Sequence, residues 1–279
     1  MIGAVITTAV AAVALLMVST WIVATIRRDV SVVDIVWGLG FAVVAVCSLV
    51  VGDGAAARRV LLAVLVGVWG LRLAGYLAWR NLGHGEDRRY RKMRDARGPW
   101  FWLISLATVF GLQGLLMVVV ALPVQLSASA EDPRRLGPLA AVGAGLWLVG
   151  LVFEAGGDLQ LARFKADPVN EGKVMDRGFW RYTRHPNYFG DVCVWWGIFL
   201  VAAETAPGRW GVAGPILMTV FLLRVSGVSL LERDIGERRP AYAAYIERTS
   251  AFLPRPPRDG PTLVDPTSDR DRRRSGPGP

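Results

Sequence analysis

The amino-acid sequence predicts an all-α integral membrane protein, a polytopic helical bundle of about seven transmembrane helices. Its 279 residues are 53% hydrophobic and include 11 tryptophans, and the mean hydropathy is +0.37. Runs of about 20 apolar residues are long enough to cross the hydrocarbon core of a bilayer as helices. Seven such runs follow one another: Ile2–Ile26, Val32–Val51, Val60–Trp79, Trp100–Leu126, Leu139–Phe153, Asp191–Ala206 and Trp210–Leu231.

The first run could be mistaken for a signal peptide, and the sixth run contains an acidic residue. No basic residue precedes the apolar stretch of Ile2–Ile26, and that stretch is longer than a usual signal-peptide core. We therefore expect it to be a retained span. The sixth run is shortened by Glu204, but its remaining residues are apolar enough for a transmembrane helix.

The distribution of Lys and Arg between the loops predicts the orientation. Loops rich in Lys and Arg lie on the cytoplasmic side of bacterial-type inner (plasma) membranes, which places the N-terminus outside and the C-terminus inside. The net charge of +9 then reflects topology and an anionic ligand, not a nucleic-acid partner, because the charge is dispersed around the spans. The basic side receives Arg27, Arg28, Arg80–Arg97, Arg163–Arg184 and the C-terminal region, and the other side receives Arg58, Arg59, Arg134, Arg135 and Arg209.

Neither a metal site nor a disulfide is expected. The two cysteines, Cys47 and Cys193, both lie in apolar runs and are typical of small packing residues. The chain has two histidines, His84 and His185, and nothing in it matches a zinc-ligand spacing.

Small residues in the fifth run favour close helix packing. Gly143, Gly145 and Gly150 do not match the dinucleotide-binding pattern G-x-G-x-x-G, because Leu148 stands at the third glycine position. Small residues in membrane helices let two backbones approach closely. We expect that role for these glycines.

The segment Arg181–Asp191, directly before the sixth run, concentrates groups that bind anions and nucleotides. Pro186 suits the first turn of a helix, so the helix is expected to open near Asn187 with free N–H groups at its positive end. Such an end binds phosphate, and Arg181 and Arg184 stand just outside it. Asn187 and Asp191, four apart, share one helix face. A ligand site is favoured over a cationic interfacial anchor.

Polar residues in the N-terminal half are candidates for acid–base chemistry. Asp34 lies near the cytoplasmic start of the second run, where it either pairs with Arg72 of the third run or lines a substrate pocket. In the loop after the third run, Gly83 and Gly85 relax the backbone. This segment either presents acid–base groups to a cavity mouth or is a solvated loop whose charges neutralise one another. Its candidate groups are Glu86, Asp87 and Tyr90.

After the seventh run the chain carries a further polar helix and then a tail. Arg233 and Asp234 extend the helix out of the bilayer, and Tyr242 and Tyr245 share a face three residues apart. This segment is either an interfacial helix with aromatic anchors or a cover over the Arg184–Asp191 site. We expect residues 1–254 to form one transmembrane domain and residues 255–279 a disordered basic tail.

These motifs together resemble a known family. They resemble the C-terminal half of membrane steroid 5α-reductases and sterol reductases, and most closely the bacterial steroid 5α-reductase-like branch of DUF1295-type membrane proteins. The resemblance covers most of Asp34–Pro254, with the reductase-like motifs concentrated in residues 139–254. The motifs are Asp34-x-x-Trp37-Gly38-x-Gly40-Phe41, Arg80-Asn81-x-Gly83-x-Gly85-Glu86-Asp87-x-Arg89-Tyr90, Arg184-His185-Pro186-Asn187-Tyr188-x-Gly190-Asp191, Glu232-Arg233-Asp234, Tyr242-x-x-Tyr245 and Phe252-x-Pro254.

The resemblance implies an enzyme that uses NADPH to reduce a carbon–carbon double bond in a hydrophobic, lipid- or steroid-like substrate. It implies a cofactor site on the cytoplasmic face, in which Asn187, Tyr188 and Asp191 hold the nicotinamide-ribose end. The phosphates and adenosine would be held by Arg184, Arg233 and Asp234. His185 would order that network, and Arg181 and Tyr245 complete the cofactor set. The candidates for the proton donor are Asp34, Glu86, Asp87 and Tyr90.

The His-Pro-x-Tyr piece also resembles isoprenylcysteine carboxyl methyltransferases, which bind S-adenosylmethionine. Arginines around the site favour NADPH, because guanidinium groups suit its diphosphate and 2′-phosphate. S-adenosylmethionine has no phosphate and carries a positive sulfonium. A membrane methyltransferase and a non-enzymatic lipid-binding protein remain as alternatives.

Overall fold

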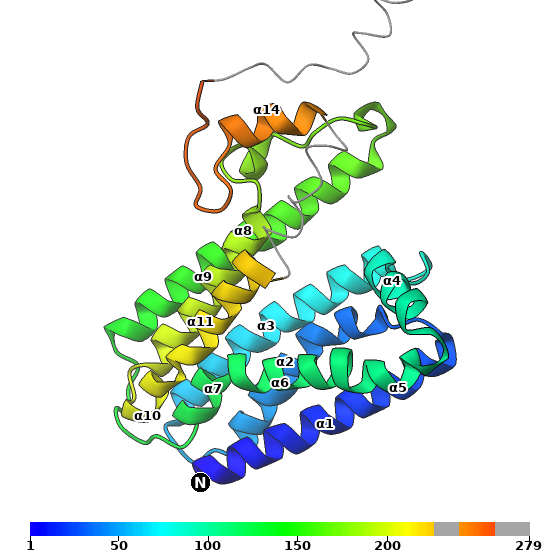
Figure 1. Cartoon of the computed structure of the whole chain (residues 1–279). Helices are drawn as coiled ribbons and strands as arrows, with labels where there is room; N and C mark the ends of the chain where they lie inside the picture. Colours follow the sequence, from blue (N-terminus) through cyan, green and yellow to red (C-terminus); the bar gives the residue numbers. More distant parts are fainter. Residues whose placement is uncertain (226–239, 260–279) are drawn as a thin grey trace, which may run out of the picture. The chain divides into compact units, whose positions relative to one another are not determined.

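The computed structural model describes residues 1–225 and 240–259, which are helical with connecting loops and no strand in those ranges (Figure 1). Six turns of π- or 3₁₀-type lie between or beside the helices of these ranges: Gly98–Trp100, Leu106–Gly111, Pro168–Asn170, Gly178–Arg181, Trp210–Val212 and Phe221–Val225. The α-helices are α1 (Ile2–Arg27), α2 (Val32–Val51), α3 (Ala56–Asn81), α4 (Arg88–Arg97), α5 (Phe101–Ser105), α6 (Leu112–Val120), α7 (Leu122–Ser127), α8 (Pro138–Ala166), α9 (Pro186–Ala202), α10 (Ala206–Arg209), α11 (Ala213–Val220) and α14 (Pro240–Arg248).

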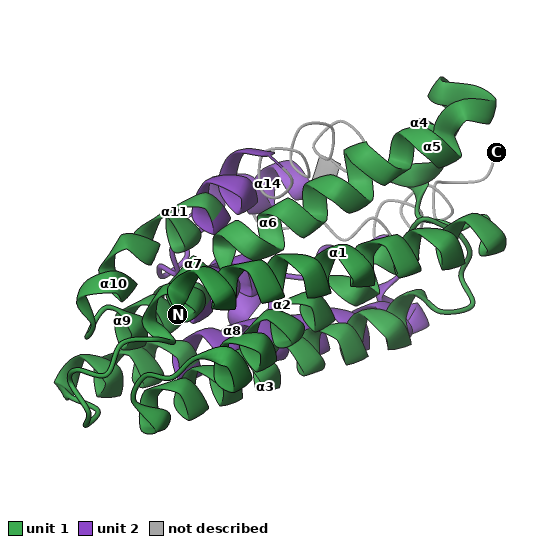
Figure 2. Cartoon of the chain, turned by 90° about the horizontal axis from the view of Figure 1, so that it is seen from below, with its two compact units in different colours: residues 1–147, 195–217 green, residues 148–194, 218–279 purple. Residues whose placement is uncertain are grey.

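The chain divides into two compact units (Figure 2). Unit 1 comprises residues 1–147 and 195–217, and unit 2 comprises residues 148–194 and 218–279. The helices α8, α9 and α11 contribute residues to both units.

Six helical stretches in the described ranges are long and apolar enough to cross a membrane, which confirms an integral membrane helical bundle. The predicted sixth run belongs to α9, which has 17 residues and is about 26 Å long, shorter than the hydrocarbon core. The count of seven therefore stays a prediction. The predicted end of the seventh run, Leu231, lies outside the described residues. The six stretches are Ile2–Arg27, Val32–Val51, Ala56–Asn81, Arg88–Val120, Pro138–Ala166 and Ala206–Val225.

Unit 1 has an aromatic core around α2, which packs against both α1 and α3. The ring of Phe41 lies 5.4 Å from Trp69 and 4.7 Å from Trp195, measured between centroids, and all three side chains are fully buried. Aromatic pairs at such distances stabilise a core beyond their buried area. Gly38 and Gly70 allow α2 and α3 to approach, because a Cβ at Gly38 would lie 2.3 Å from the Gly70 carbonyl oxygen.

Unit 2 is built on a close contact between α8 and α9. A Cβ on Gly150 would lie 2.5 Å from the carbonyl oxygen of Gly190, and a Cβ on Gly190 would lie 2.5 Å from the backbone nitrogen of Glu154. Further along, Gly157 faces Pro186, the first residue of α9. The predicted packing role is confirmed for Gly143 and Gly150. It is wrong for Gly145, because a Cβ at that position meets nothing within 4 Å.

Gly150→Ala is expected to destabilise the protein by about 1–3 kcal/mol, because the added methyl group overlaps backbone atoms of α9 that cannot move independently. The measurement is thermal unfolding of the purified chain in detergent. Gly145→Ala is the matched control on the same helix, since a Cβ there meets nothing within 4 Å and alanine favours a helix. An equal loss in both variants would contradict a specific α8–α9 contact.

Candidate functional site

The loop before α9 is buried. Pro186 is the first residue of α9, as the sequence predicts. Thr183, Arg184 and His185, which precede it, are 0%, 6% and 4% exposed. An interfacial anchor of the bilayer surface would hold these side chains at the water boundary. Their burial therefore favours a built site over the anchor.

Helix α14 and the segment that follows it are hydrogen-bonded to this loop. The Arg184 guanidinium donates hydrogen bonds to the carbonyl oxygens of Ile246, at 3.0 Å, and Thr249. The Thr183 hydroxyl donates to the carbonyl of Phe252 at 2.8 Å, and the Tyr245 hydroxyl donates to the carbonyl of Trp180. These contacts agree with the expected cover over the site. They give Arg184 and Tyr245 a positioning role, and their cofactor contacts stay predictions.

The first turn of α9 meets buried carboxylates on α8. Glu154 and Asp158, four residues apart, are 4% and 6% exposed, and the Asn187 amide donates to Asp158 Oδ1 at 3.3 Å. Asp191 is buried on α9, one turn beyond Asn187. The carboxylates of α8 are absent from the sequence-based site, although acidic residues four apart beside an apolar run were a usable signal.

His185 and Tyr188 complete this end of α9. Their rings stack with centroids 5.4 Å apart and planes within 4°. The N–H of His185 donates to the Thr183 hydroxyl oxygen at 3.3 Å, which fixes the entry to the helix. The predicted residues His185, Asn187, Tyr188 and Asp191 thus lie together in unit 2. Arg233 and Asp234 lie outside the described residues.

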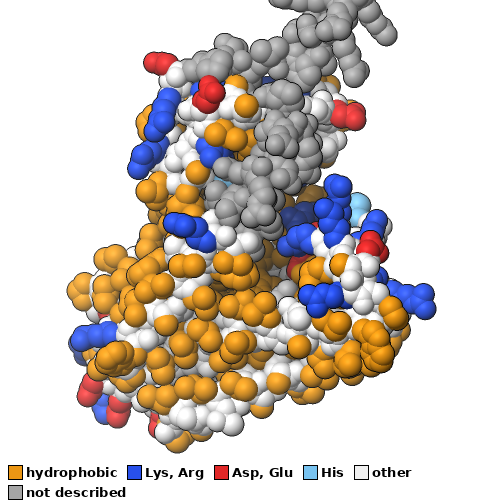
Figure 3. Space-filling view, in the orientation of Figure 1, with side chains coloured by type: hydrophobic (Ala, Val, Ile, Leu, Met, Phe, Trp, Pro, Cys, Tyr) orange, Lys and Arg blue, Asp and Glu red, His pale blue; other side chains and the backbone are white. Residues whose placement is uncertain are grey.

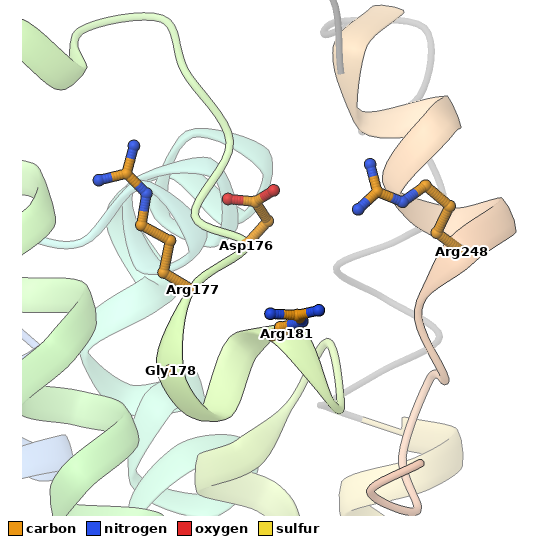
Figure 4. Close-up of a pocket in the computed structure, with 5 residues that line it drawn as sticks. All are labelled: Asp176, Arg177, Gly178, Arg181 and Arg248. Atoms are coloured by element: carbon orange, nitrogen blue, oxygen red, sulfur yellow. The ribbon is translucent and has the colours of Figure 1, made fainter. Parts of the chain in front are cut away.

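An arginine pocket of about 490 Å³ opens in unit 2 (Figure 4). Arg181, from the turn Gly178–Arg181, and Arg248, the last residue of α14, come from its two walls, with Arg177 and Asp176 on the connecting loop. Gly178 also lines it, with a φ of +57° that few other residues adopt. The predicted residue Arg181 is joined here by Arg177 and Arg248, which sequence reasoning missed.

In unit 1, the partly buried Asp34 and the buried Tyr90 form an acid–hydroxyl pair. The Tyr90 hydroxyl donates to Asp34 Oδ1 at 2.6 Å, and Arg89 Nη2 donates to Asp34 Oδ2 at 2.8 Å. The side-chain contacts of Asp34 in the described chain are with these two residues and not with Arg72, so the expected Asp34–Arg72 pair is wrong. The other expected role of Asp34, lining a substrate pocket, stays a prediction.

Gln113 extends this pair. Its Nε2 donates to the Tyr90 hydroxyl oxygen at 3.4 Å, and its Oε1 is buried without a hydrogen-bond partner among the described residues. It follows a π-helical turn, Leu106–Gly111, a deviation that is frequent at functional sites. Neither Gln113 nor Arg89 was among the predicted site residues.

Glu86 and Asp87 hold the loop before α4 in place. Glu86 accepts hydrogen bonds from Arg94, at 2.7 and 3.0 Å, and from the N–H of Val30 at 3.0 Å. Asp87 caps α4 by accepting from the N–H of Arg89 at 2.8 Å. These contacts are structural, so Asp34 and Tyr90 are the better-placed candidates for acid–base chemistry.

Glu86 should make the stability of this loop depend on acid. Burial raises the pKa of Glu86, but the hydrogen bonds from Arg94 and Val30 outweigh burial and hold the pKa below its ordinary value. The stabilisation is therefore present above the pKa of the unfolded chain, roughly 4.3, and is lost as pH falls through the lower folded-state pKa. Glu86→Gln should flatten the fall of unfolding temperature in acid. Asp95→Asn, which removes an exposed carboxylate of α4, is the control, and equal effects would contradict the assignment.

Comparison with known proteins places the chain in a family. The Uncharacterized protein C594.04c of Schizosaccharomyces pombe is 24% identical over 263 residues, which cover 84% of this chain and 75% of that protein. The Probable O-methyltransferase ustE of Ustilaginoidea virens is 31% identical over 134 residues, which cover 41% of this chain and 47% of that protein. No solved structure matches. The family model described as "Protein of unknown function (DUF1295)" matches residues 20–249, so the chain belongs to DUF1295, the steroid 5α-reductase-like family.

Proposed function

We propose that the protein is an NADPH-dependent membrane reductase of a carbon–carbon double bond in a hydrophobic, lipid- or steroid-like substrate. The observation that carries this proposal is the arginine pocket of unit 2, lined by Arg177, Arg181 and Arg248. Guanidinium groups bind phosphate through paired, charge-assisted hydrogen bonds. NADPH offers a diphosphate and a 2′-phosphate, whereas S-adenosylmethionine offers none.

The remaining polar groups of unit 2 fit the rest of the cofactor. Asp176, on the pocket wall, is an acceptor for a ribose hydroxyl. Asn187 and the buried carboxylate Asp158 add donors and acceptors of the kind that a nicotinamide carboxamide and its ribose need. When bound, the cofactor supplies a hydride, and the protein supplies binding and orientation.

The acid–hydroxyl pair of unit 1 fits the proton-transfer half of the reaction. Reduction adds a hydride to one carbon of the double bond and a proton to the other, leaving the oxidised cofactor. Asp34 orients the Tyr90 hydroxyl, and Gln113 occupies the acceptor side of that hydroxyl. We assign Tyr90 as the proton donor: its O–H turns from Asp34 to the substrate carbon, the tyrosinate that forms accepts from Gln113 Nε2, and a proton from solvent restores the hydroxyl.

The direct test compares NADPH with S-adenosylmethionine on the purified full-length chain by thermal shift. A ligand that binds the folded state raises the unfolding temperature in proportion to the logarithm of its concentration over its dissociation constant. A dose-dependent rise with NADPH alone supports the reductase and justifies assays with conjugated enone lipids. Absence of a rise with either ligand would reject both enzymes and leave the lipid-binding alternative.

A methyltransferase is the second candidate, because a named O-methyltransferase is similar to 41% of this chain. In that case the polar residues of unit 2 would hold S-adenosylmethionine, and the acceptor would be a thiol or carboxyl group on a lipid-modified molecule. A thermal rise with S-adenosylmethionine alone would select this function. S-adenosylmethionine offers the three arginines of the pocket one carboxylate and no phosphate, which makes the methyltransferase the less favoured function.

A further inference from the structure

The helix α4 carries two sets of cations with different surroundings. Six of its ten residues are Lys or Arg. Two point to acidic partners, since Arg89 pairs with Asp34 and Arg94 pairs with Glu86. The other four form no ion pair within the described ranges and are exposed to solvent. Three of them lie on one side of the helix, which we name the α4 basic face: Arg88, Arg91 and Lys92. Arg97 lies on the other side of the helix.

The α4 basic face adjoins an apolar, tryptophan-bearing surface. The chain passes from α4 through Gly98–Trp100 into α5 and the rest of a candidate membrane span. Trp100 and Trp102 are 64% and 45% exposed at that entrance, as tryptophans are at a membrane–water boundary. Figure 3 shows Lys and Arg side chains gathered over α4, with hydrophobic side chains next to them on the helices of unit 1.

We propose that the α4 basic face binds the phosphate of an anionic phospholipid headgroup, with the acyl chains against the apolar surface beside Trp100 and Trp102. Arg88, Arg91 and Lys92 lie at i, i+3 and i+4, so they share one helix face and can surround one phosphodiester. Asp95 lies on the same face and reduces its charge by one. Clusters of basic residues beside a membrane helix attract anionic lipids.

A free soluble anion could bind the side chains of the α4 basic face, but it could not contact the apolar surface beside them. A phospholipid can bind the basic side chains through its phosphate and lay its acyl chains on the surface beside Trp100 and Trp102, whereas inorganic phosphate can use only the charges. The opposite face of α4 holds Asp34 through Arg89 and Glu86 through Arg94. Lipid binding therefore secures the helix that positions Tyr90, and it should stabilise the fold whether or not the protein is a reductase.

The test measures binding of short-chain phosphatidylglycerol to the detergent-purified full chain by thermal shift, with short-chain phosphatidylcholine as the neutral lipid. We expect phosphatidylglycerol alone to raise the unfolding temperature at low salt. Arg88→Gln combined with Lys92→Gln should weaken this binding at least about tenfold, since each basic residue near an anionic surface contributes roughly a fivefold factor. Arg134→Gln combined with Arg135→Gln removes the same charge from exposed residues of another loop and should leave binding unchanged.

Three results would overturn the proposal. Equal responses to the two lipids would show that the headgroup charge is not recognised. Equal losses in the two double variants would show that net charge, and not the α4 basic face, attracts the lipid. Full displacement by inorganic phosphate at the concentration of the lipid would assign the site to a soluble anion. Because none of these readouts uses NADPH, they are independent of the test of the reductase.

Discussion

Asp34→Asn is expected to lower turnover at least about 100-fold while NADPH binding stays unchanged, because positioned acid–base groups contribute at least that factor. The substitution keeps the shape of the side chain but replaces an acceptor oxygen with an NH₂ donor. The remaining amide oxygen must then serve two donors, the Tyr90 hydroxyl at 2.6 Å and Arg89 Nη2 at 2.8 Å, so the hydrogen bond that orients the Tyr90 proton is weakened. Turnover is measured as NADPH oxidation with a conjugated enone lipid, and binding is measured by thermal shift.

Asp87→Asn is the matched control for this experiment. Asp87 also contacts Arg89, through its side chain at 3.0 Å, and asparagine caps a helix as well as aspartate does. The control variant should therefore retain both turnover and stability. A parallel loss of NADPH binding in Asp34→Asn would contradict a role in proton transfer and make Asp34 a structural residue. Tyr90→Phe should reproduce the loss of turnover without disturbing the fold, because it removes only the hydroxyl.

The sequence was sufficient for the membrane helices and for some of their close contacts. Long apolar runs can satisfy their backbone polar groups in lipid only as helices, so composition alone predicted the bundle. Gly150 was expected to allow close packing, and a Cβ at that position would overlap the backbone of α9. The start of α9 at Pro186 followed from the fixed backbone angle of proline, which depends on no other part of the chain.

The interior of the candidate site was less predictable, because it depends on contacts between distant segments. Arg184 was expected to face a phosphate, but it is buried against carbonyl groups 62 to 65 residues away. Arg248 joined the pocket only because α14 lies against the turn that contains Arg181. Ending the fifth run at Phe153 excluded Glu154 and Asp158, although α8 continues to Ala166. Contacts of this kind are set by tertiary packing, and the periodicity of hydrophobic residues along the sequence does not predict them.

Substitutions in the arginine pocket are expected to have the second large effect, a loss of affinity for NADPH. Arg181→Gln and Arg248→Gln should each weaken NADPH binding about tenfold or more, because a hydrogen bond to a charged group contributes about 1.5–3 kcal/mol. Both side chains line the pocket without being buried, so their removal should leave the fold intact. Affinities for NADPH and NADH are measured side by side on each variant. Arg163→Gln, an exposed residue of α8 outside the pocket lining, is the control.

The comparison of the two cofactors identifies which phosphate the pocket holds. A larger loss for NADPH than for NADH places the 2′-phosphate between Arg181 and Arg248, since NADH lacks that group. Equal losses place the shared diphosphate there instead. Unchanged affinities in both variants would separate the pocket from the cofactor altogether. Arg184→Gln cannot answer this question, because its hydrogen bonds to Ile246 and Thr249 hold α14 in place and their loss should lower the unfolding temperature first.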